Sequence, residues 1–303
     1  MGIHEQPGNL RPQTVGGLID TTFRLYRRHF LSLMLLTICI YLPYLIVESL
    51  FNIHTQTFVS GLLQNVQNPA VVQQKVIAQL PTLIAGFVFT LLSAFVVIPL
   101  LYGSVLHIVV SLQYDRQERP CGNWAAFLHA WRRLPAVLGT NVLRWIIYFV
   151  AFAVSAAIII AVGALFGGMG LTSAAVTVAV MILSLTAAVF LIWLAVKFAF
   201  VPSATLEEKV SFGASFRRSF ELTRGNMWRI IGYYIVVKLL IFVVSLGFGL
   251  LLSLVKAVVL QSILTDLVAV VVTPFSILAM AILYLDLRIR TEAPDLAAWL
   301  RDE

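Results

Sequence analysis

The chain has 303 residues, of which 60% are hydrophobic and 12% are charged, and its net charge is +7. A soluble domain carries charge on about a quarter of its residues, because it needs a polar shell against water. This composition excludes an ordinary soluble protein and predicts one whose surface is covered by lipid. The positive charge does not indicate nucleic-acid binding, because the basic residues stand at the ends of long apolar runs, as in oriented membrane proteins.

The N-terminal segment, residues 1–17, is polar. The apolar run that begins at Phe30 is longer than the core of a secretory signal peptide, and no small-residue cleavage site follows at a suitable distance. We therefore expect the first apolar helix to stay in the protein as a membrane anchor.

Six apolar runs are long enough to cross a membrane, which takes about 20 helical residues. The second and fourth exceed this length, so we expect them to tilt or to project beyond the lipid. The predicted spans are residues 30–51, 82–112, 142–166, 171–201, 233–255 and 263–285.

A short stretch rich in basic and aromatic residues precedes the first, third and fifth spans. In the clearest case Phe212, Phe216 and Phe220 recur at four-residue spacing, arginines fill the other faces, and Gly225 follows as a helix stop. This pattern predicts an amphipathic helix in the membrane interface.

The predicted fold class is therefore all-α: a polytopic membrane protein with six transmembrane helices, built from three repeats of an interfacial amphipathic helix plus two spans. We expect a single membrane domain over residues 1–303, with repeats at 18–114, 122–206 and 211–290.

Prolines recur in the even-numbered spans. Val96-Val97-Ile98-Pro99 matches Val271-Val272-Thr273-Pro274, and Pro202 ends the fourth span. Proline removes a backbone donor, so we expect kinks at which neighbouring groups bond the freed carbonyl.

Lysine and arginine gather on one side of the predicted spans: the N-terminal segment, the loops after spans two and four, and the C-terminal tail. The opposite side has only Lys75 and Lys256. Because positive residues accumulate in cytoplasmic loops, we expect both termini in the cytoplasm and the chain as a multi-pass protein of a bacterial inner membrane.

The sequence shows no catalytic constellation. There is no glycine loop for phosphates and no carboxylate cluster of a metal-dependent hydrolase. The five histidines are scattered without metal-ligand spacing: His4, His29, His54, His107 and His129. We therefore expect a protein that is not an enzyme, with no cofactor, catalytic residue or metal site.

The basic stretches are candidate contacts for lipid headgroups, at about 1 kcal/mol for each basic residue near an anionic surface. The same helices also serve as elbows that fix how each helix pair enters the membrane, and the two roles are compatible. The candidate residues are Arg24, Arg27, Arg28, Arg132, Arg133, Arg217, Arg218 and Arg224.

Charged residues inside spans are functional suspects by default. Lys197 and Lys238 either snorkel to the headgroups or line a polar cavity with a carboxylate partner. Glu48 and Asp266 stand at the outer ends of their spans, where the simpler interpretation is solvation. These four residues form the candidate intramembrane polar site.

Small residues on span three predict close helix packing. Ala153, Ala157 and Ala161 share one face, and Gly163 and Gly167 are spaced for helix contact. Packing within the chain is one use, and a homodimer face is the alternative.

Several motifs resemble the glycerophosphoryl diester phosphodiesterase membrane domain family. Phe200-Val201-Pro202, Glu207-Glu208 and residues 216–229 (FRRSFELTRGNMWR) resemble its central signature. Pro274 with residues 283–292 (LYLDLRIRTE) resembles its C-terminal signature, and residues 23–30 (FRLYRRHF) fit its opening. In some members this domain is fused to a catalytic barrel, which the present sequence lacks, so the resemblance implies a fold and a location but no reaction.

The sequence thus favours a non-enzymatic integral membrane protein that contacts anionic lipid and acts as a scaffold or accessory subunit for a membrane-associated partner. The alternative is a small transporter or lipid-handling permease that uses a cavity between the repeats. A membrane-embedded hydrolase is disfavoured because the carboxylates are missing. We expect membrane lipids and a membrane protein as partners, and no nucleic acid.

Overall fold

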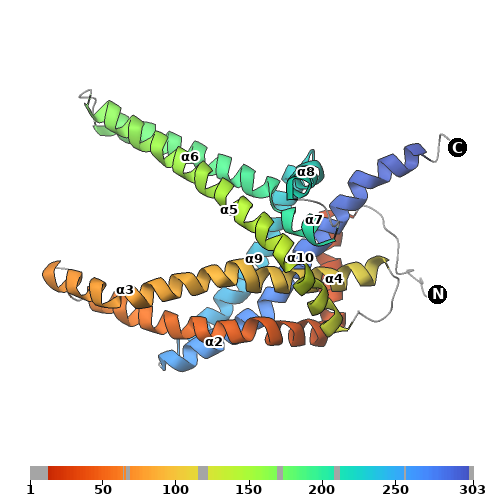
Figure 1. Cartoon of the computed structure of the whole chain (residues 1–303), viewed down its shortest axis with the longest axis horizontal. Coiled ribbons are helices and arrows are strands. Elements are labelled where there is room, and N and C mark those ends of the chain that lie inside the picture. The colour runs from red at the N-terminus through yellow and green to blue at the C-terminus, as the bar shows by residue number, and fades with distance from the viewer. Residues whose placement is uncertain are drawn as a thin grey trace. The chain divides into compact units, whose positions relative to one another are not determined.

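The computed structural model describes residues 13–63, 65, 69–114, 122–168, 173–207, 212–255 and 257–299. These residues form helices joined by short connections, with no strand among them (Figure 1). The elements are α1 (Val15–Arg28), α2 (Phe30–Leu63), α3 (Pro69–Leu92), the π-helix η1 (Ser93–Val97), α4 (Ile98–Tyr114), α5 (Asn123–Gly168), α6 (Ser173–Lys197), α7 (Val201–Glu207), α8 (Phe212–Thr223), α9 (Met227–Leu252) and α10 (Val258–Trp299).

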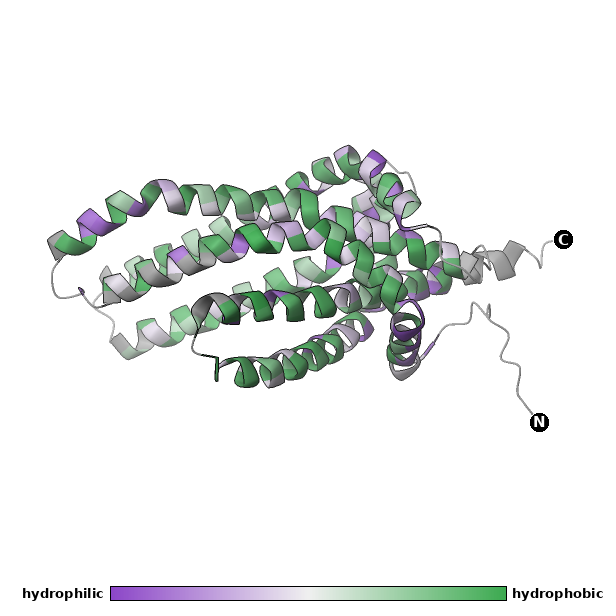
Figure 2. Cartoon of the chain, turned by 90° about the horizontal axis from the view of Figure 1, so that it is seen from below, coloured by the Kyte–Doolittle hydropathy of each residue, from purple (hydrophilic) through white to green (hydrophobic). Residues whose placement is uncertain are grey.

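Six segments of this part of the chain are long and apolar enough to cross a membrane, which confirms the predicted all-α polytopic fold. They are Phe30–Phe51, Val71–Leu112, Asn123–Phe166, Val176–Glu207, Met227–Leu252 and Leu260–Thr291. Figure 2 shows hydrophobic residues along most of the length of the long helices. The second, third and sixth segments are clearly longer than the predicted spans, because further helical residues continue the apolar runs.

The chain divides into two compact units, and we describe each by itself. Unit 1 comprises Met1–Leu134 and Gly232–Glu303, and unit 2 comprises Pro135–Ile231. In unit 1, α10 lies against α1, α2 and α4. Its residues from Ala281 to Leu287 are all buried, so α10 forms the core of this unit.

Helix α1 is docked along α10. Its first turn is held where the backbone of Gln13 bonds Asp286 and Arg290, and its last turn is held where the Tyr26 hydroxyl donates to the carbonyl of Val271 (2.7 Å). These contacts extend along α10 from Val271 to Asp286, a length of about 22 Å at the rise of an α-helix. The predicted helix before span one exists, and its Leu18 face packs against protein.

The stretch before span three differs from the prediction of a separate helix. It continues without a break into the span as α5, with Pro135 inside the helix. Asn123 ties its start to α2 through the Ser32 hydroxyl (2.5 Å) and the Ser32 carbonyl (3.1 Å). Ala126, Ala130 and Leu134 are buried, which explains why this stretch packs as part of unit 1.

In unit 2 the fourth span breaks between α6 and α7, just before Pro202. The Ser219 hydroxyl of α8 donates to the Lys197 carbonyl (2.6 Å) and accepts the Phe200 N–H (3.3 Å). One side chain thus bonds two backbone groups that the broken helix leaves without helical partners. The carbonyl that Pro202 itself leaves without a donor, that of Phe198, accepts the Val201 N–H (3.4 Å).

Pro99 and Pro274, the matched prolines of the second and sixth spans, are accommodated differently, both within unit 1. Before Pro99 the helix widens into the π-turn η1, where the Ile98 N–H bonds the Ser93 carbonyl five residues back. At Pro274, α10 stays helical and the Tyr26 hydroxyl bonds the Val271 carbonyl. Burial raises the pKa of Tyr26 to about 12, which keeps this phenol protonated as a donor.

We expect Ser219→Ala to lower the free energy of unfolding by about 1–3 kcal/mol, because it leaves a buried carbonyl and a buried N–H without their hydroxyl partner. Thermal unfolding of the purified protein in neutral detergent measures this. The matched control is Ser184→Ala, which removes an exposed hydroxyl from α6 in the same unit. Equal unfolding temperatures for the two variants would contradict the role given to Ser219.

Candidate functional site

Helix α1 carries the basic surface of unit 1. Thr14 caps its first turn by accepting the Gly17 N–H, and Leu18 and Thr22 are buried, so Asp20, Arg24, Arg27 and Arg28 are left on the exposed side. With Phe23 these four side chains line an open hollow of about 730 Å³. Three arginines and one aspartate give the hollow a net charge of +2. The predicted headgroup residues Arg24, Arg27 and Arg28 therefore do form one surface.

His29 joins this surface to the first span. It is the C-terminal cap of α1, where its N–H bonds the Leu25 carbonyl, and the span begins at the next residue. Burial lowers the pKa of His29 below its usual value of 6.5, and the positive charge of Arg28 lowers it further. The ring is therefore held neutral at physiological pH despite its basic surroundings.

Arg132 and Arg133 also belong to unit 1, near the point where α5 leaves it. Arg132 and Trp131 are exposed, Arg133 is partly buried, and the opposite face is packed through Ala130 and Leu134. Trp124, Phe127 and Trp131 stack in a row along this start of α5. The aromatic row beside the arginines is the composition of a helix at a membrane interface.

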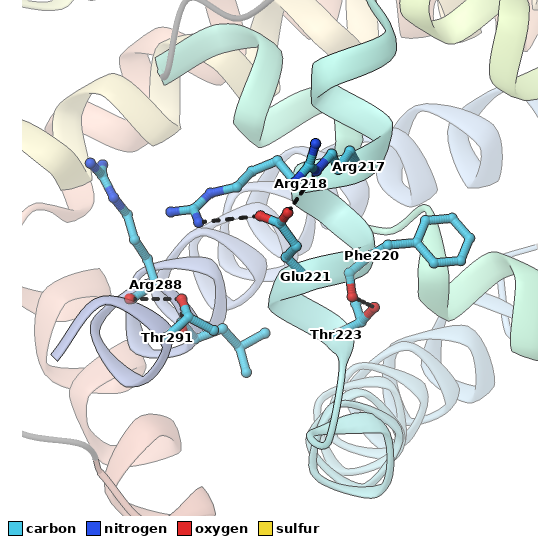
Figure 3. Close-up of polar contacts among 8 residues, drawn as sticks. Arg217, Arg218, Phe220, Glu221, Thr223, Arg288 and Thr291 are labelled. Carbon is cyan, nitrogen blue, oxygen red and sulfur yellow. Dashed lines mark hydrogen bonds and ion pairs between the residues drawn. The ribbon is translucent and has the colours of Figure 1, made fainter. Parts of the chain in front are cut away.

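Helix α8 carries the basic residues of unit 2. Figure 3 shows Glu221 beside Arg217 and Arg218; the Arg217 ion pair measures 3.0 Å and the Arg218 pair 3.9 Å. Exposed pairs of this kind contribute only about 0.3–0.5 kcal/mol, so an anionic ligand can displace them. Arg224 follows, exposed, before Gly225, whose φ of +77° ends the helix as predicted.

The structure brings together two of the four intramembrane charges. Glu48 of α2 and Asp266 of α10 lie close enough for the charge of one carboxylate to act on the other. The charges of both carboxylates also reach the side chain of Tyr41. The Tyr44 hydroxyl interacts with Glu48 and with Ser93, the first residue of the π-turn. Ser49, which interacts with Asp266, and Thr273, which interacts with Tyr41, complete this polar cluster. All of its residues belong to unit 1.

Lys197 and Lys238 are not part of that cluster. In unit 2 the Lys197 ammonium lies 5.9 Å from the Trp193 ring centre and 5.5 Å from that of Phe220. In unit 1 the exposed Lys238 lies 5.3 Å from the ring centre of Tyr234. Lys197 is the last residue of α6, a position typical of a snorkelling cation, whereas Lys238 lies near the middle of α9 (Met227–Leu252).

The small residues of span three are only partly used for packing within the chain. Ala153, Ala157 and Ala161 are exposed. Gly163 faces α6, where an added methyl group would lie 3.7 Å from Val180. The packed face of α5 in unit 2 is therefore the one that carries Gly163, and the alanine face points away from it.

Sequence reasoning missed a pair of histidines in unit 1. The rings of His107 on α4 and His129 on α5 stack with centres 3.9 Å apart and planes 8° apart. The prediction that the histidines are scattered does not hold for these two. Nothing in their 22-residue separation indicated the contact, because it depends on how α5 packs back on α4.

The fold and these surfaces define an all-α, multi-pass integral membrane protein with basic helices and one intramembrane acidic cluster. Residues 132–287, just over half of the chain, match the model of a family described as a domain of unknown function, DUF7847. The chain belongs to this family. Comparisons with curated proteins and with solved structures found no match. The resemblance to the glycerophosphoryl diester phosphodiesterase membrane domain stays a prediction.

We expect Arg28→Gln to raise the pKa of His29 while leaving it below 6.5, because burial is the larger cause of the shift. Histidine NMR titration in neutral detergent measures this, with His29→Gln to assign the signal. Since the folded pKa lies below the unfolded value, the folded state loses stability as the pH falls through 6.5 towards the folded pKa. A native midpoint above 6.5 would contradict this account.

Proposed function

We propose that this protein binds anionic phospholipid at the cytoplasmic face of a bacterial inner membrane and there scaffolds a membrane-associated partner. Six apolar spans make it an integral membrane protein. The side that carries α1, the start of α5 and α8 is the cytoplasmic one by the positive-inside rule.

The hollow on α1 is the observation that carries this proposal. Arginine binds phosphate through paired N–H donors, and Arg24, Arg27 and Arg28 offer three such forks around one opening. Phe23 lines the same opening and is exposed, so it suits contact with the glycerol and acyl region below a headgroup. A phosphate over a cationic hollow with an aromatic rim is the arrangement that an anionic phospholipid requires.

Replacing Arg24, Arg27 and Arg28 together by Gln should reduce the preference for anionic over zwitterionic lipid. At about 1 kcal/mol for each basic residue, the upper limit is a loss of roughly 100-fold in relative affinity. Native mass spectrometry of protein released from nanodiscs of phosphatidylglycerol and phosphatidylcholine measures the lipids retained.

Two matched variants make this test specific. Arg217, Arg218 and Arg224 replaced by Gln should cost less, because Glu221 already pairs with two of them. Lys75→Gln removes a cation from the opposite side and should change nothing. An α1 variant that keeps the native lipid preference would refute the lipid site. Copurification from native membranes then identifies the partner.

The acidic cluster around Glu48 and Asp266 favours a second candidate function, a small transporter or lipid-handling permease. Intramembrane carboxylates with hydroxyl neighbours mark substrate or ion pathways in such proteins. The cluster reaches from these carboxylates to Thr273 beside Pro274 and to Ser93, where the second segment departs from regular α-helix geometry at the π-turn. Helix irregularities in membrane proteins occur where they face protein or a water-filled cavity.

Cysteine labelling decides whether water reaches this cluster. In a background with Cys39 and Cys121 replaced by Ala, we expect Thr273→Cys to react with a membrane-impermeant thiol reagent if a pathway exists. Leu267→Cys, on the exposed apolar face of the same helix and nearer its outer end, should stay unreactive. An unreactive Thr273→Cys would count against the permease and leave the scaffold.

A further inference from the structure

The stacked histidines of unit 1 form a cluster of potential metal ligands that the proposed function does not use. His107 comes from the second span and His129 from the start of α5. Each ring is partly buried, and one ring nitrogen of each lies within 4.8 Å of a ring nitrogen of the other. Their helices are fixed around them, since Leu106, Ile108, Ala126 and Ala130 are fully packed.

We propose that His107 and His129 bind a divalent transition metal ion. Two imidazole nitrogens at about 2.0–2.1 Å from a tetrahedral metal lie about 3.3 Å apart, so the pair needs to close by at most about 1.5 Å. Because the rings lie nearly parallel, their in-plane lone pairs must also turn towards a common ion, which requires rotation of one or both side chains.

The donor chemistry selects the class of metal. Neutral imidazole is a borderline ligand that suits Zn²⁺, Cu²⁺ and Ni²⁺, whereas Mg²⁺ and Ca²⁺ prefer oxygen. Two protein nitrogens leave the remaining coordination positions for solvent or for oxygen donors.

The two histidines lie on two different helices of unit 1, α4 and the start of α5. His107 lies five residues before the end of the second span, and His129 lies three residues before Arg132. A metal ion between them would cross-link α4 to the start of α5, which otherwise is tied through the Asn123 contacts with Ser32. Binding to the folded state alone raises its stability by mass action.

The test uses the full chain in neutral detergent, purified through an affinity tag that contains no histidine, with CuCl₂ and ZnCl₂ as probes. We expect one Cu²⁺ per chain, with electron paramagnetic resonance couplings from two imidazole nitrogens. His107→Gln and His129→Gln should each remove one nitrogen coupling and weaken binding by about tenfold or more, in line with the sensitivity of metal sites to ligand loss. His54→Gln is the matched control, since His54 is exposed and bonds its own helix at the Leu50 carbonyl.

Two results would contradict the proposed metal site. Native protein without stoichiometric Cu²⁺ binding, or a double variant that binds Cu²⁺ as tightly as the native chain, would overturn it and leave the pair as a packing contact. If the variants do not fold, the native chain still provides a test. Zn²⁺ at 100 times its Kd should raise the unfolding free energy by about 2.7 kcal/mol, whereas Mg²⁺ should not. Equal effects of Zn²⁺ and Mg²⁺ would refute the site.

Discussion

In hydrocarbon each backbone N–H and carbonyl must find a partner within the protein, and prolines in the spans make that requirement hard to meet. Three devices meet it near Pro99, Pro202 and Pro274, the prolines of the even-numbered spans. A π-turn precedes Pro99, the Ser219 hydroxyl bridges the break before Pro202, and the Tyr26 hydroxyl bonds a carbonyl beside Pro274. Both hydroxyls belong to arginine-bearing helices.

This constraint joins the basic helices to the spans. In unit 1, α1 presents arginines on one side and the Tyr26 hydroxyl to α10 on the other. In unit 2, α8 presents Arg217 outwards and buries Ser219 against the end of α6. Each helix is at once a charged surface and a structural support for a proline-containing span. A ligand that moves either helix would therefore act on a proline-containing segment of its own unit.

The sequence predicts the six spans well, because length and hydropathy determine membrane crossing almost without tertiary information. It also predicts α1, α8 and the stop at Gly225, where local patterns are strong. It does not predict that the start of α5 fuses with its span, since this depends on the burial of Ala126, Ala130 and Leu134 in unit 1. The proximity of Glu48 to Asp266, and of His107 to His129, likewise arises from helix packing and leaves no periodic signal.

The assignment of the intramembrane charges shows the same limit. Sequence position alone treats Lys197, Lys238, Glu48 and Asp266 as equivalent suspects. Packing separates them, because each lysine lies over aromatic rings while the carboxylates share a cluster with Tyr41 and Tyr44. The three repeats remain a prediction, and the recurrence of a hydroxyl from a basic helix at a proline break is consistent with them.

The central claim is that six helices cross the membrane with their arginine-bearing segments on a single side. Single cysteines in a cysteine-free background, probed with an impermeant reagent in vesicles of known orientation, test it most directly. Arg132→Cys and Arg217→Cys should react from the cytoplasmic side, and Gln73→Cys from the other. Labelling of Arg132→Cys and Arg217→Cys from opposite sides would contradict the account.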